Sequence, residues 1–264
     1  MAFARISDVV LHYRLTGPAD GPVLVFVNSL GTDARIWDEV IAHFAGRHRC
    51  LSYDKRGHGL SDTPAGDYSL SDHLNDLEGL LDHCGAGRVV LVGVSIGGLI
   101  GQGLALRSPE RLAGLVLCDT APRVGTDDFW SARMDAVNRG GIAAIADGIM
   151  ERWFSPGFRS NRPIELGGWR NLLLRSDPQG YVSTCATLRD TDLSGEIGAI
   201  DCPTLVVAGD ADLATPVELV RACARAIPGA RFEVMAGVGH IPSIEQPDAL
   251  AALINHFIEE LGHG

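Results

Sequence analysis

"VLVGVSIGGLIGQ", residues 90–102, is an apolar run interrupted by four glycines and by Ser95. Its first half has the length and β-rich composition of a buried strand, and the part after Ser95 is typical of a helix that ends before Pro109. A turn from a strand directly into a helix strains the backbone, and Gly93 and Gly97 lack the Cβ atoms that would collide there. The pattern therefore predicts a serine hydroxyl held in the open at a helix N-terminus.

The pentapeptide Gly-x-Ser-x-Gly around Ser95 has two interpretations. It occurs by chance, and glycines at this spacing also permit close helix packing. Its place between a strand and a helix, with Gly98 extending the small-residue face, favours a serine nucleophile. Free N–H groups and the positive end of the helix dipole favour negative charge that develops beside such a serine.

Strands and helices alternate on either side of this turn. Residues 23–28, 50–54, 88–94 and 112–120 are short apolar runs typical of strands covered on both faces, and 9–15 alternates. Helical patterns occupy 34–46, 69–84 and 96–108, and two further strands, 204–210 and 231–237, precede a closing helix over 246–261. This alternation predicts an α/β fold in which crossover helices join parallel strands.

The middle of the chain breaks the alternation. Residues 123–195 look helical and contain no convincing strand. We interpret this segment as a helical cap inserted into the sheet domain, which then consists of residues 1–122 and 196–264.

Composition limits the class of protein. The chain has 264 residues, of which 46% are hydrophobic and 21% charged, as in one globular unit. The net charge of −11 argues against nucleic acid and anionic membranes as partners, since both require a basic surface. No apolar run approaches the roughly 18 residues of a membrane span, and no secretory signal opens the sequence, so we expect a soluble protein.

Cysteine usage predicts a reducing environment. Six cysteines lie far apart without CxxC spacing, which disfavours a disulfide framework or a zinc site. They are Cys50, Cys84, Cys118, Cys185, Cys202 and Cys223. A cytoplasmic location is the simplest expectation, and the sequence gives no indication of the oligomeric state.

A serine nucleophile needs a base and an acid later in the chain, in the order Ser, Asp, His. His240 follows a predicted strand in the glycine-rich "AGVGHIPSIEQPD", where it can reach the same end of the sheet as Ser95. Most other histidines lie on polar stretches, and for these we expect a surface position. They include His43, His48, His73, His83, His256 and His263.

The loop after the strand at 204–210 supplies the acid. In "GDADLATP", Asp212 is placed beyond the strand end, where it can meet the imidazole of His240, and Asp210 is the second candidate. Either aspartate can instead cap the helix that begins near Pro216.

Two backbone N–H groups should face the developing oxyanion. The amide of Ile96 is one, and the second comes from the loop "NSLGT", where we nominate Leu30 because Gly31 lets the loop bend close. Asn28 and Ser29 can alternatively serve as loop residues that satisfy the backbone. The nearby "YDKRGHGLSD", residues 53–62, lacks the features of a phosphate loop and is interpreted as a rigid turn.

These motifs together resemble the α/β-hydrolase family over essentially the whole chain. "DKRGHGLSD", "GVSIGG", "GDADLATP" and "GHIPSIEQP" each stand where that family has its corresponding motif. The resemblance implies a mostly parallel eight-stranded sheet with flanking helices and an inserted helical cap. It also implies that Ser95, Asp212 and His240 form a catalytic triad.

Within the family, the sequence resembles the 3-oxoadipate enol-lactonase group. The resemblance rests on "NSLGTDARIWD", "CDTAPRVGT", the cap stretch "GGIAAIADGIMERWFSPGF" and "GYVSTCATLRDTDL". It implies hydrolysis of a small anionic lactone, 3-oxoadipate enol-lactone, through an acyl-enzyme in aromatic compound degradation. No metal or organic cofactor is implied.

An anionic substrate requires compensation in a pocket of low dielectric. Arg133 on the cap is the first candidate for this role, and Trp130 and Trp153 are candidates for the apolar wall. The alternative interpretation places Trp153 in the core of the cap and Arg133 on a solvated face.

Three other functions share the same motifs. A carboxylesterase and a carbon–carbon bond hydrolase would use the same triad, and a ligand-sensing protein could keep the fold without turnover. Dehalogenases and epoxide hydrolases are disfavoured because their nucleophile is an aspartate at the position of Ser95.

Overall fold

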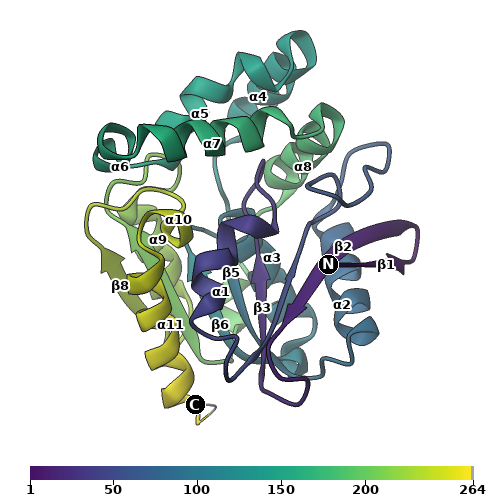
Figure 1. The fold of residues 1–264 in the computed structure, drawn as a ribbon, viewed down its shortest axis with the longest axis vertical. Helices are drawn as coiled ribbons and strands as arrows, with labels where there is room; N and C mark the ends of the chain where they lie inside the picture. The colour runs from purple at the N-terminus through teal and green to yellow at the C-terminus, as the bar shows by residue number, and fades with distance from the viewer. Residues whose placement is uncertain (263–264) are drawn as a thin grey trace.

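A computed structural model of the protein describes residues 1–262 and contains one eight-stranded sheet (Figure 1). The strand order is β1-β2-β4-β3-β5-β6-β7-β8. The strands are β1 Ala2–Ile6, β2 Val9–Thr16, β3 Val23–Val27, β4 Arg49–Tyr53, β5 Val89–Val94, β6 Leu112–Cys118, β7 Thr204–Gly209 and β8 Arg231–Met235. Only β1–β2 and β2–β4 pair antiparallel, so the predicted mostly parallel eight-stranded sheet is confirmed.

Seven of the eight strands follow from the sequence patterns. Every residue of β5, β6 and β7 is buried, as their continuous apolar runs require. The pattern did not predict β1, a five-residue edge strand in which exposed Arg5 lies between buried Ala4 and Ile6. Its alternation is too short to distinguish it from a loop.

Helices and short 3-10 turns connect and cover the strands (Figure 1). Those of the sheet domain are η1 Ala34–Trp37, α1 Asp38–Ala42, α2 Leu70–His83, α3 Ile96–Arg107, η2 Pro109–Arg111, η4 Ile197–Ala199, α9 Val217–Ala226, α10 Pro242–Glu245 and α11 Pro247–Glu260. α2 packs on α3, which lies against β5 and β6, and α1 packs on α11. The predicted helix over 34–46 is thus a 3-10 turn followed by a short α-helix.

The chain between β6 and η4 contains helices joined by loops and no strand. Its elements are α4 Asp127–Gly140, η3 Ile142–Ala144, α5 Ala146–Trp153, α6 Pro156–Asn161, α7 Pro163–Leu174 and α8 Pro178–Asp190. They lie together over one end of the sheet, at the top of Figure 1. α4 packs on α8 and α5 packs on α7, so the segment has its own internal contacts. We refer to α4–α8 as the cap.

Two expectations about surface residues are wrong. His48 and His73 are each 1% exposed, although both lie in polar stretches of sequence. His73 lies on the inner face of α2 and contacts the ring of Tyr68 edge-on, and burial lowers its pKa to about 3. His263 lies outside the described residues.

The six cysteines are buried and free. Among residues 1–262, none of the helices has the length and apolar character needed to cross a membrane.

Candidate active site

Ser95 follows β5 directly and adopts a strained backbone conformation, with φ of 58° and ψ of −121°. Its N–H donates to Cys118 O on β6, and Thr120 Oγ1 donates to Ser95 O at 2.6 Å. A Cβ atom on Gly97 would lie 2.2 Å from Val27 O, and one on Gly93 would lie 2.3 Å from Gly97 O. The flanking glycines are therefore required by backbone contacts on both sides of the turn.

His240 and Asp212 are in direct contact. His240 Nδ1 lies 2.8 Å from Asp212 Oδ2, and both side chains are buried. Asp212 also accepts from the N–H of Ala214 and from the N–H and hydroxyl of Thr215, so its carboxylate is fixed in place. Asp210 is exposed and accepts from Gly237 N instead. The structure therefore brings Asp212, and not Asp210, to the imidazole.

The charge of Asp212 is stabilised despite its burial. Burial alone would raise the pKa of this carboxyl, but His240 and the hydrogen bonds around it hold the pKa below the ordinary value. Asp119, at the end of β6, has the opposite environment. Burial and the neighbouring Asp212 raise the pKa of Asp119 well above its usual range, and its Oδ2 has no partner among the described residues. The pKa values of the two neighbouring carboxyls are therefore shifted in opposite directions, that of Asp212 down and that of Asp119 up.

Leu30 and Ile96 present backbone N–H groups at the same end of the sheet. Ile96 is the first residue of α3, so its N–H has no acceptor within the helix. No acceptor for the Leu30 N–H is found within residues 1–262. Leu30 lines the same cavity as Ser95, which directly precedes Ile96, so both predicted oxyanion donors lie close to the predicted nucleophile.

The turn at residues 53–62 supports the loop that carries Leu30. Lys55 Nζ donates to Asn28 O and Ser29 O at 3.0 Å each, and Gly31 N donates to His58 Nε2 at 3.0 Å. Burial is the main cause that lowers the pKa of His58 well below its usual range, so its ring stays neutral and can accept. The rigid turn predicted from sequence thus positions the loop, a role that the sequence pattern did not reveal.

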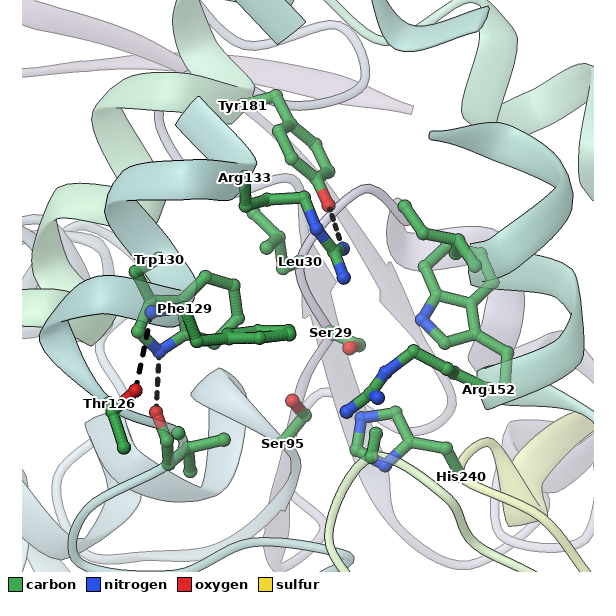
Figure 2. A pocket seen from close by; sticks show the side chains of 15 residues that line it. Ser29, Leu30, Ser95, Thr126, Phe129, Trp130, Arg133, Arg152, Tyr181 and His240 are labelled. Atoms are coloured by element: carbon green, nitrogen blue, oxygen red, sulfur yellow. Dashed lines mark hydrogen bonds between the residues drawn. The ribbon is translucent and has the colours of Figure 1, made fainter. Parts of the chain in front are cut away.

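A cavity of about 310 Å³ lies between the sheet and the cap (Figure 2). Its size is at the lower end for ligand pockets, which suits a small molecule. It is lined by Ser29, Leu30, Ser95, Val124, Gly125, Thr126, Phe129, Trp130, Arg133, Ile149, Arg152, Trp153, Tyr181, Ala214 and His240. The predicted substrate-binding residues Trp130, Arg133 and Trp153 are among them, and so are Ser95 and His240.

The cavity contains a second arginine that the sequence analysis missed. Arg152 extends into the same space as Arg133, Ser95 and His240 (Figure 2). It immediately precedes Trp153 on α5, but nothing in the local sequence separates it from the many other arginines. Only the packing of α5 over the end of the sheet brings it to the cavity.

Neither cavity arginine is paired with a carboxylate in the described part of the chain. The guanidinium carbons of Arg133 and Arg152 lie 5.0 and 5.2 Å from the Phe129 ring centre, and Arg133 Nη1 donates to Tyr181 Oη at 3.2 Å. Burial, together with the like charge of Arg133, lowers the pKa of Arg152. Two half-buried cations beside one ring form an electropositive wall that an anion would stabilise.

Metal ligands do not gather in the described residues, where no group of three or more His, Cys, Asp or Glu side chains is arranged around a common point. The hydrogen-bonded Asp–His pair, a serine that lines the cavity at a strand-to-helix turn, and backbone N–H groups without an acceptor among residues 1–262 are the parts that acyl transfer requires.

The sequence matches the Alpha/beta hydrolase family over residues 24–253, and the chain belongs to this family. It is 36% identical to 3-oxoadipate enol-lactonase 2 of Acinetobacter baylyi, across 96% of this chain and 93% of that protein. The protein is accordingly a hydrolytic enzyme of the carboxylic ester hydrolase type.

Two solved structures share the fold over nearly the whole chain. The enol-lactonase from Burkholderia xenovorans superposes with a TM-score of 0.95 at 35% identity, over 98% of this chain and all of that one (100%). A thermophilic esterase from Thermogutta terrifontis, solved with malate bound, has a TM-score of 0.93 at 28% identity and covers 99% of both chains.

Proposed function

We propose that the protein hydrolyses 3-oxoadipate enol-lactone to 3-oxoadipate in the degradation of aromatic compounds, with Ser95 as nucleophile. The identity to enol-lactonases over nearly the whole chain supports the reaction class. The single observation that carries the substrate assignment is the pair Arg133 and Arg152. Two cations without carboxylate partners among the described residues face Ser95 across a small cavity, in a protein whose net charge is −11.

The acetate arm of the lactone binds at the two arginines in this proposal. A carboxylate that leaves water loses its hydration, and charge-assisted hydrogen bonds to guanidinium replace it. Phe129 and Trp130 pack against the apolar face of the five-membered ring. This placement directs the lactone carbonyl toward Ser95 at the opposite side of the cavity.

Acylation begins when Ser95 Oγ attacks the lactone carbonyl and His240 Nε2 accepts its proton. Asp212 holds the other ring nitrogen of His240 and stabilises the imidazolium. The N–H groups of Leu30 and Ile96 donate to the oxyanion. The bond between the acyl carbon and the ring oxygen then breaks, and the ring oxygen takes the electron pair and a proton from His240, leaving an enol that becomes a ketone.

Deacylation repeats these steps with water in place of Ser95. His240 accepts a proton from water as the water oxygen attacks the acyl carbon, and it returns the proton to Ser95 Oγ when the ester bond breaks. The product carries a second carboxylate. No step of this mechanism requires a metal or an organic cofactor.

The test is steady-state hydrolysis of freshly generated enol-lactone beside a neutral aryl ester. We expect a far higher kcat/KM for the lactone, and a loss of about 10⁴-fold or more for both substrates in Ser95→Ala. Substantial activity in Ser95→Ala would contradict the nucleophile. Hydrolysis of the aryl ester alone would contradict the lactone.

A second candidate is a carboxylesterase for other small anionic esters. The structural similarity to an esterase solved with malate, a dicarboxylate, supports it. The monomethyl ester of succinate separates the two candidates. Equal or better turnover of this open-chain ester, relative to the lactone, would favour the second.

A further inference from the structure

Glu245 links the cap to the loop that carries His240. Its Oε1 accepts from Ser155 N at 3.0 Å and from Gly239 N at 2.8 Å, and its Oε2 accepts from Ser155 Oγ at 2.5 Å. Gly239 directly precedes His240, and Ser155 follows the end of α5. One buried carboxyl on α10 thus binds backbone from both sides of the cavity.

A backbone bond between the same two segments reinforces this contact. His240 N donates to Trp153 O at 2.8 Å. The segments approach so closely that a Cβ atom on Gly239 would lie 2.6 Å from Trp153 O and 2.8 Å from Ser155 N. The loop that carries His240 and the end of α5 are therefore held against each other, and neither can shift without breaking these hydrogen bonds.

One of the two linked segments carries residues proposed to bind the substrate, and the other carries the residue proposed to transfer the proton. Arg152 and Trp153, on the cap side, line the cavity where the substrate arm would bind, and His240 lies on the other side. The proposed mechanism does not use Glu245, and it is only 6% exposed. Burying a carboxyl is costly unless it is hydrogen-bonded, and here its bonds go to the two segments that need alignment.

We propose that Glu245 is a positioning residue that aligns the Arg152–Trp153 wall of the cap with His240, so that one contact sets both substrate binding and proton transfer. This inference rests on the proposed function for its kinetic consequences. The contact itself can be tested without substrate.

The test compares Glu245→Gln with Glu245→Met. Glutamine retains one oxygen for the N–H groups of Ser155 and Gly239, whereas methionine has similar length and no comparable acceptor. We expect Glu245→Gln to keep kcat and KM within about threefold, because only the bond from Ser155 Oγ is altered. We expect Glu245→Met to lower kcat about tenfold for both esters and to raise KM for the anionic lactone alone.

Hydrogen exchange measures the contact directly. The amides of Ser155, Gly239 and His240 should exchange faster in Glu245→Met and at the wild-type rate in Glu245→Gln. The exposed Glu110, far along the chain from both segments, supplies matched controls, because Glu110→Gln and Glu110→Met should change neither kinetics nor these amides. If Glu245→Met yields no folded protein, Ser155→Ala carries the test, with a smaller kcat loss and a smaller KM increase in the same directions.

The outcomes separate the two proposals. A wild-type protein that turns over neither ester contradicts the proposed function, and the exchange rates still test the contact. An active wild type with unchanged kinetics and unchanged amide exchange in Glu245→Met overturns the positioning role. An equal loss in Glu245→Gln and Glu245→Met also overturns it, since the retained oxygen would then have no effect.

Discussion

The strand ends and the cap wall hold their cavity residues by different means. Ser95, Asp212 and His240 are fixed by backbone conformation and by hydrogen bonds to buried neighbours. Arg133 and Arg152 are held mainly by the face of Phe129 and by one tyrosine hydroxyl. Contacts within the protein hold the first set in place, whereas the guanidinium charges of the second have no carboxylate partner among residues 1–262. Variants of the first set should therefore lose kcat for every ester, whereas variants of the second should lose kcat/KM for the anionic lactone only.

The largest effect is expected at Asp212, the aspartate that contacts His240. Asp212→Asn should lower kcat about 10⁴-fold for any ester, because the imidazole loses the partner that fixes its tautomer. Asp210→Asn, two residues away and exposed, should leave kcat within about twofold. Steady-state kinetics on the lactone and the aryl ester measure both. A large loss in Asp210→Asn with an active Asp212→Asn would reverse the assignment of the acid.

Substitution of the cap arginines, Arg133 and Arg152, should affect the binding of the anionic lactone more than kcat. Arg152→Gln and Arg133→Gln should each reduce kcat/KM for the lactone by roughly 10- to 100-fold, the range of one charge-assisted hydrogen bond, chiefly through KM. The neutral aryl ester should be nearly unaffected. Arg139→Gln on the exposed face of α4 is the control. Equal losses with both esters would mean that the arginines support the fold of the cap and do not select the anion.

A smaller effect is expected from the turn at residues 53–62, which supports the loop that carries Leu30. His58→Ala removes the acceptor of the Gly31 N–H and should lower kcat about tenfold for both esters, less than the loss of a direct oxyanion donor. The exposed His43→Ala is the matched control. If His58→Ala changes only KM for the lactone, the loop belongs functionally with the cap wall.

The last prediction concerns the pH dependence of stability at Asp119. Its pKa is raised in the folded state, so folding takes up a proton above the ordinary carboxyl pKa, and stability falls as pH rises toward the folded value. The fall is about 1.4 kcal/mol for each pH unit over which only the folded state holds the proton. Asp119→Asn keeps the shape, cannot ionise and should flatten this slope.

Thermal unfolding of wild type and Asp119→Asn between pH 5 and pH 8 provides the measurement. Parallel curves for the two proteins would show that Asp119 is ionised in the fold. The depressed pKa of Asp212 acts at the other end of the scale, because the stability that it contributes is present above the ordinary carboxyl pKa and is lost as pH falls through the lower folded value.

The residues at the strand ends could be predicted from the sequence, whereas those that link the cap to the sheet could not. Ser95, Asp212 and His240 each lie in a short motif after a strand, so their meeting follows from the parallel sheet alone. Arg152 and Glu245 have no such local signal. Glu245 contacts Gly239, six residues away, and Ser155, 90 residues away, and only the packing of the end of α5 against α10 brings Ser155 to it. Edge strand β1 was missed because its alternation covers only five residues, and buried His73 was missed because its neighbours in sequence are polar.

Lys55, which supports the loop that carries Leu30, can report on the opening of this loop through the reactivity of its amine. The sequence contains a single lysine, Lys55, which is 1% exposed and bound to the carbonyls of residues 28 and 29. An acylating reagent therefore finds no lysine side chain on the surface and can reach this one only when the loop lifts away. The rate at which Lys55 is acylated, located by peptide mass spectrometry and separated from acylation of the exposed Met1 α-amine and of Ser95, would measure how often this loop opens.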